Sequence, residues 1–184
     1  MNINLPLHFA RAIDTYPGLS FGIHVLFEGV VLDVFRFGEF LGQNDVDKQI
    51  FRMVMQDEAR HVAYGTMHLK HYLDSKPATE RDEAIDDLSA FAKMGEPFFL
   101  QQFLLNPAII EALAVCAVGG DLSRIDRGLE IFGVMFKNIR REYLRRLDRC
   151  GMGVYAESCM IPEEPPFLPE GHDLSAVEAE LVGA

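Results

Sequence analysis

Apolar residues recur at spacings of three and four along most of this chain, while the alternation of apolar and polar residues that marks strands is scarce. The pattern predicts an all-α fold. A short helix is expected over residues 7–14, ending at the turn signal Tyr16-Pro17-Gly18. Residues 20–41 are apolar on nearly every side, which is typical of a central rather than a surface helix.

The same spacing predicts further helices downstream. Residues 46–73 predict a helix of roughly 40 Å, and Asn44 or Asp45 can cap its start. Three more helices are expected, over about 79–105 with a kink at Gly95 and Pro97, over 107–118, and over 123–149 with a cap at Ser123.

The composition changes after Gly151. The stretch IPEEPPFLPEGHD is rich in proline, which is unsuited to the interior of a helix. We therefore predict a helical domain over residues 1–150 and a Pro-rich C-terminal arm over 151–184. The arm could pack on its own domain, or it could lie as a strap across a partner subunit, anchored by Phe167 and Leu168.

Charge and cysteine usage narrow the functional classes. The formal net charge of -11 argues against binding to nucleic acid or to anionic lipid. The three cysteines include no C-x-x-C pair, so neither a disulfide framework nor a thiolate zinc site is indicated. Polar residues interrupt the apolar window 98–118, and the N-terminus lacks a secretory pattern. We expect a cytoplasmic protein without a nucleic-acid or membrane partner.

Polar residues occur where the helix over 46–73 should be buried. Steps of three and four place one set of residues on a single face: Ile50, Val54, Glu58, His61, Gly65, and then His68 or Leu69. Glu58 and His61 thus lie one turn apart within an apolar stripe. An unpaired buried carboxylate costs several kcal/mol, so Glu58 must be protonated, paired or bound to a metal.

The preceding helix repeats this anomaly. Glu28 lies among apolar neighbours, and His24 is one turn earlier on the same face. The link between the two helices is short, so we expect them to be antiparallel neighbours that share a polar centre. Two carboxylates and an imidazole are ligands that iron or manganese accepts in an oxygen-rich site. Glu28, Glu58 and His61 are therefore the candidate metal ligands.

These motifs resemble a known family. FEGVVLDVF, followed thirty residues on by QDEARHVAYG, is similar to the second half-site of the ferritin-like di-iron carboxylate superfamily, on the branch of the ribonucleotide reductase small subunit and the bacterial di-iron oxygenases. The resemblance covers residues 21–73. It implies a ferritin-like helical bundle in which Asp57 accepts a hydrogen bond from a metal-bound histidine. His24 would support the ligands, and Arg60 would point away and pair with an acid.

The resemblance also implies a function. A di-iron centre, or one containing manganese, would support O₂-dependent oxidation of a small organic substrate, or the storage of a radical. Gly65, on the same face as His61, would leave room for a channel or pocket beside the metals. The alternative is a non-catalytic ferritin-like helical dimer that stores iron or binds no metal.

The chain supplies only half of the pattern. A complete site of this family has four carboxylates and two histidines, and Glu28, Glu58 and His61 account for three of the six. Three explanations are open. The chain could be the C-terminal part of a longer protein, or a twofold homodimer could rebuild the site from a half-bundle. Alternatively, hydrogen bonds and salt bridges could satisfy the polar centre of a degenerate family member.

Overall fold

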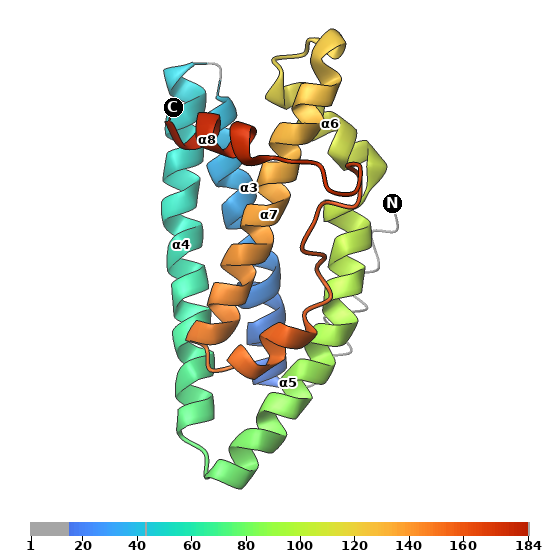
Figure 1. Cartoon of the computed structure of the whole chain (residues 1–184). Coiled ribbons are helices and arrows are strands. Elements are labelled where there is room, and N and C mark those ends of the chain that lie inside the picture. The colour runs from blue at the N-terminus through green and yellow to red at the C-terminus, as the bar shows by residue number, and fades with distance from the viewer. Residues whose placement is uncertain (1–14, 43, 184) are drawn as a thin grey trace.

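The computed structural model describes residues 15–42 and 44–183, and every regular element within these ranges is helical (Figure 1). The predicted all-α fold is therefore confirmed for the described part of the chain. The short helix expected over residues 7–14 lies outside it.

The first described helix is continuous from Tyr16 to Leu41, and its middle segment is π-helical while both ends are α-helical. It comprises α2 (Tyr16–Ser20), the π-helical η1 (Phe21–Phe27) and α3 (Glu28–Leu41). The prediction that Tyr16-Pro17-Gly18 ends a helix is wrong, because these three residues begin the helix α2. Proline is tolerated there, since the first N–H groups of a helix have no partner within it.

The remaining elements follow most of the predicted boundaries. They are α4 (Asp45–Asp74), α5 (Ala78–Phe99) with its π-helical continuation η2 (Leu100–Leu104), α6 (Pro107–Ala117), η3 (Leu122–Arg124), α7 (Ile125–Arg149), η4 (Gly153–Ser158) and α8 (Ser175–Gly183). Asn44 caps α4 as expected, since its Oδ1 accepts a hydrogen bond from the N–H of Asp47 at 2.9 Å. Ser123 does not cap α7, because it lies within η3.

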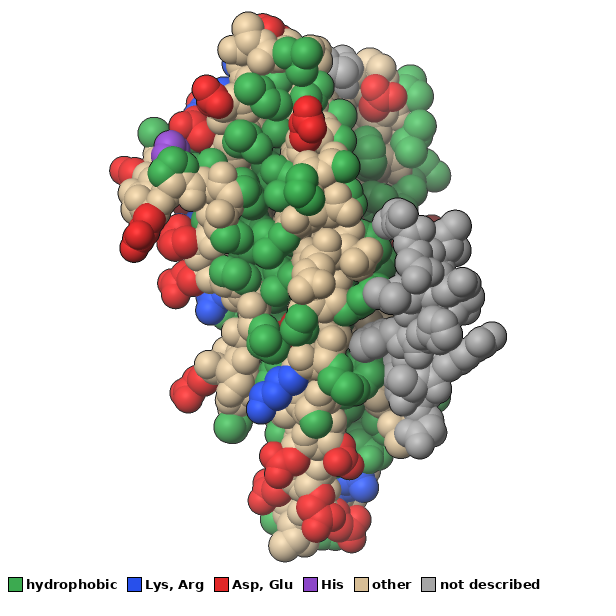
Figure 2. Space-filling view, turned by 90° about the vertical axis from the view of Figure 1, so that its right-hand side faces the viewer, with side chains coloured by type: hydrophobic (Ala, Val, Ile, Leu, Met, Phe, Trp, Pro, Cys, Tyr) green, Lys and Arg blue, Asp and Glu red, His purple; other side chains and the backbone are tan. Residues whose placement is uncertain are grey.

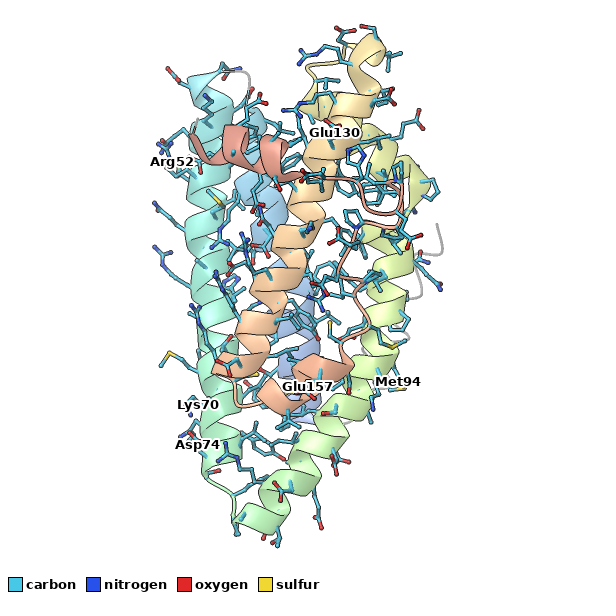
Figure 3. The ribbon with its side chains drawn as sticks, in the orientation of Figure 1. Arg52, Lys70, Asp74, Met94, Glu130 and Glu157 are labelled. Carbon is cyan, nitrogen blue, oxygen red and sulfur yellow. The ribbon has the colours of Figure 1, made fainter. Side chains whose placement is uncertain are left out.

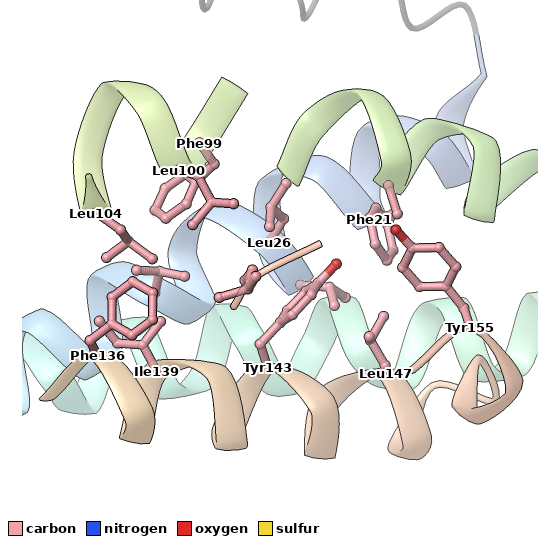
Figure 4. Packing of buried hydrophobic residues seen from close by; sticks show 14 of the residues in the cluster. Phe21, Leu26, Phe99, Leu100, Leu104, Phe136, Ile139, Tyr143, Leu147 and Tyr155 are labelled. Carbon is pink, nitrogen blue, oxygen red and sulfur yellow. The ribbon is translucent and has the colours of Figure 1, made fainter. Parts of the chain in front are cut away.

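The long helices form a bundle around the first helix. In Figure 1, α7 crosses in front of α3, α4 lies on one side and α5 on the other. Figure 4 shows the core where the first helix, α5 with η2, and α7 meet, including Phe21, Leu26 and Tyr143. In α4, by contrast, the buried residues all come after the midpoint, from Val62 onward. The first half of α4 therefore lies at the edge of the bundle.

The C-terminal arm packs on its own chain. The ring of Phe167 lies 5.0 Å from that of Phe132 and 5.9 Å from that of Phe136, both on α7. These contacts do not support the interpretation of Phe167 as an anchor on a partner subunit. The arm also ends in α8, which the proline content had not indicated, because the last proline precedes that helix.

One described helix, Tyr16–Leu41, is long and apolar enough to cross a membrane. However, 56% of its apolar window is buried inside the bundle, and the core helix of a soluble protein has the same composition. Residues 98–118 do not form a straight span, since the helices Ala78–Leu104 and Pro107–Ala117 meet at 52°. The helix is therefore weak evidence for a membrane location.

Candidate metal centre

Glu28, Glu58 and His61 come together between the first helix and α4. One ligand atom from each of the three lies within 4.8 Å of the others. His61 Nδ1 is 3.5 Å from Glu58 Oε2 and 3.9 Å from Glu28 Oε1. Ligand atoms bound about 2.1 Å from one octahedral ion are roughly 3 to 4 Å apart. The three side chains thus need only small movements to hold a single ion.

A close approach of the two helices produces this arrangement. Gly65 of α4 faces His24 on η1, and a Cβ added at Gly65 would lie 2.1 Å from His24 Cβ. Only glycine permits this contact, which brings Glu28 toward α4. The room beside Gly65 is filled by His24, so the channel or pocket predicted there is wrong.

His24 holds Glu28 in place. The spacing of four residues led us to expect a contact, and His24 Nδ1 lies 2.6 Å from Glu28 Oε2 in a hydrogen bond. Tyr64 on α4 packs edge to face on the His24 ring, with centroids 6.1 Å apart. The imidazole thus orients one oxygen of Glu28 and leaves the other facing His61.

Glu58 carries the clearest sign that a cation fits. Its Oε2 is buried and accepts no hydrogen bond within the described part of the chain. A buried acceptor that lacks a donor costs about 1 to 3 kcal/mol, and more when it is charged. Glu28 and Glu58 contribute two carboxylates to the same space, which a divalent cation would neutralise. Hard oxygen donors with one imidazole match the preferences of iron and manganese.

The structure places Asp57 at the surface of α4. Its side chain is 69% exposed and forms a salt bridge with Arg60, which is 73% exposed. Arg60 pairs with an acid as predicted. No described hydrogen bond joins Asp57 to a histidine of this chain. A role for Asp57 in orienting a metal ligand therefore stays a prediction, and only an assembled site could realise it.

The predicted buried stripe on α4 is open along its first half. Ile50 is 55% exposed, Val54 is 36% exposed, and the His61 side chain is 56% exposed. Burial along the stripe begins at Gly65 and continues at Leu69. The expectation of burial is wrong for Ile50, Val54 and His61, because α3 packs on another side of this half of α4 and no described segment of the chain covers the side on which these three residues lie.

A buried ion pair behind the site was missed from the sequence. Arg146 of α7 donates from Nε to the carbonyl oxygen of Val25 at 3.1 Å and from Nη1 to Asp33 Oδ2 at 3.3 Å. Burial raises the pKa of Asp33 to about 6, although Arg146 and Arg36 oppose this shift. An acidic residue within an apolar stretch of sequence could have indicated that Asp33 is buried. Its partner could not be inferred, because Arg146 is more than a hundred residues away.

Glu96 is a second buried carboxylate that the sequence did not reveal. It is 0% exposed and accepts hydrogen bonds of 2.7 Å from the Tyr143 hydroxyl and from the N–H of Met160. Burial raises the pKa of Glu96, while these two donors act in the opposite direction. Glu96 thus fixes the segment after η4 to α5 and α7. It has no contact with the candidate metal ligands among the described hydrogen bonds.

Comparison of the chain with family models, with curated proteins and with solved structures gave no match. An inference about function therefore depends on the candidate metal centre and on the motif that led to it. In the described residues, Glu28, Glu58 and His61 are the one group found whose ligand atoms could hold a metal ion.

Proposed function

We propose that this chain is a ferritin-like metal-binding protein in which Glu28, Glu58 and His61 hold iron or manganese. One observation carries the proposal: the three ligand atoms lie within 4.8 Å of one another, and one of the carboxylate oxygens, Glu58 Oε2, is buried without a hydrogen bond. A divalent cation at this point satisfies that oxygen and offsets the two negative charges.

The chain's own residues would supply the binding and the orientation. Glu28 and Glu58 provide anionic oxygens from two helices, and His61 provides a neutral nitrogen. His24 fixes the carboxylate plane of Glu28 through its 2.6 Å hydrogen bond. An iron pair, which needs the four carboxylates and two histidines of a complete site, would supply O₂-dependent oxidation of a small organic substrate. We propose this oxidoreductase activity, in the cytoplasm, as the function of the assembled protein.

Metal binding is tested with purified protein exposed to ferrous iron without oxygen, desalted and analysed for metal. We expect bound iron in the wild type and only background iron in Glu58→Gln, because an amide is a weak ligand for iron. Glu83→Gln, in the exposed first turns of α5, is the matched control and should bind as the wild type does. Iron-free Glu58→Gln should be no less stable than the wild type, since a buried charge is removed.

Two results would contradict the proposal. One is a wild-type protein that retains neither iron nor manganese, and the other is equal retention by Glu58→Gln. The first result would favour the alternative function, a metal-free helical protein that acts through protein contacts. The contact of His24 with Glu28 favours that alternative to a degree, because it satisfies part of the polar centre without a metal.

A further inference from the structure

Exposed hydrophobic side chains are concentrated on the two helices that carry the candidate ligands. Ten of the fourteen large exposed hydrophobic residues in the described part lie there: Tyr16, Ile23, Phe27 and Phe40 on the first helix, and Val46, Ile50, Met53, Val54, Tyr64 and Met67 on α4. The six on α4 form the larger group, and a gathering of exposed apolar side chains marks an interaction site in a soluble protein.

The six residues on α4 share one side of the helix. Helical spacing places Val46, Ile50, Met53, Val54, Tyr64 and Met67 on that side together with His61, and we call this set the α4 face. The α4 face therefore includes a candidate metal ligand, and its apolar residues flank the half-site.

The charge of the α4 face differs from that of the whole chain. The chain has a formal net charge of -11, and acidic side chains gather at the end of the molecule where α5 begins (Figure 2). Between Val46 and Met67, all of which is described, Asp57 is the one exposed acid, and Arg60 neutralises it. Outside the half-site carboxylates Glu28 and Glu58, two copies of this surface can meet without net repulsion.

We infer that the α4 face is a twofold interface with a second copy of this chain, which brings two half-sites together. The inference rests on the proposed function. An interface across a twofold axis uses the same patch on both subunits. Because His61 lies within the α4 face, an axis that passes close to His61 places both sets of Glu28, Glu58 and His61 side by side. The pair then contains the four carboxylates and two histidines of a complete site.

The available surface is one exposed face of a long helix. The 30 residues of α4 span roughly 45 Å, and one helix face is about 10 Å wide. That area is on the order of 450 Å², about half of the roughly 800 Å² that each partner contributes to a standard interface. We therefore expect a reversible pair.

The test is the molar mass of the metal-free protein by light scattering after gel filtration in chelator. The wild type should have twice the chain mass of 20.7 kDa. Ile50→Glu, which places a charge in the α4 face of both copies, should weaken association at least tenfold and give a monomer. Met94→Glu is the matched control, because Met94 is 61% exposed against 55% for Ile50. Met94 lies on the outer side of α5, away from α4 (Figure 3), so this variant should remain a dimer.

Circular dichroism of both variants checks that the helices remain folded. A wild-type monomer would overturn the inference and leave the α4 face to a different protein. A dimer that persists in Ile50→Glu would also overturn it, because the copies would then associate through another surface.

Iron loading separates this inference from the proposed function. A monomer that retains iron contradicts the interface and supports metal binding. A dimer that depends on Ile50 but retains no iron supports the interface and contradicts metal binding. If both hold, Ile50→Glu should lose most of its iron per chain although each ligand is present, whereas Met94→Glu should retain it.

Discussion

Gly65→Ala tests whether the close approach of α4 to the first helix sets up the candidate metal centre. The added Cβ would lie 2.1 Å from His24 Cβ, whereas real Cβ contacts closer than 3.0 Å are essentially never seen. His24 Cβ is fixed by its backbone, so a change of rotamer cannot relieve the clash. The helices must instead move apart by about 1 Å, and overpacking against an atom that cannot rotate away costs about 2–3 kcal/mol, the upper part of the usual range.

The higher helix propensity of alanine offsets about 1 kcal/mol of this cost. We therefore expect Gly65→Ala to lower the free energy of unfolding by about 1–2 kcal/mol. With an m-value of about 2 kcal/mol/M, the urea midpoint should fall by about 0.5–1 M. Unfolding is followed by circular dichroism, and iron retention is measured on the same samples. Retention should fall as well, because separation of the helices moves Glu28 away from Glu58.

Gly133→Ala is the control for the glycine substitution. Its added methyl group meets the ends of the Leu168 and Leu174 side chains, which can rotate, and alanine has the higher helix propensity here too, so stability should fall by no more than about 0.5 kcal/mol. A Gly65→Ala protein as stable as the wild type would refute the packing argument. A destabilised protein with unchanged iron retention would refute the link between this contact and the site.

Three further predictions concern the buried polar groups and the C-terminal arm. Burial raises the pKa of Asp33 from 3.8 to about 6, so the folded state binds the proton more tightly. Wild-type stability should therefore fall by about 2 kcal/mol as the pH rises from 4 to 6, and Asp33→Asn should remove that slope in urea titrations. Tyr143→Phe removes a donor from buried Glu96 and should lower the free energy of unfolding by about 1–3 kcal/mol, seen as a lower urea midpoint. Phe167→Ala should expose the arm to limited proteolysis, with cleavage after residue 158 and an intact bundle.

Local sequence determined the helices and the pairing of polar groups within them. Glu58 and His61, or His24 and Glu28, lie one turn apart wherever these segments are helical, so their spacing alone predicted that they share a face. The short link between the two segments also predicted that they pack together. Proline was less informative about helix boundaries, because it can either end a helix or stand in its first turn. Pro17 stands in the first turn of a helix where the sequence suggested that a helix ends.

The tertiary structure decided what each face of a helix meets, because burial depends on segments distant in sequence. The stripe through Ile50 and Val54 has the pattern of a buried face, yet no described part of this chain covers it. Asp33 and Arg146 form a buried pair across 113 positions, which no local pattern indicates. Asp57 points outward because the opposite side of α4 packs on the first helix. The sequence by itself therefore identified the half-site, and only the packing showed that its exposed side is where a second half-site can bind.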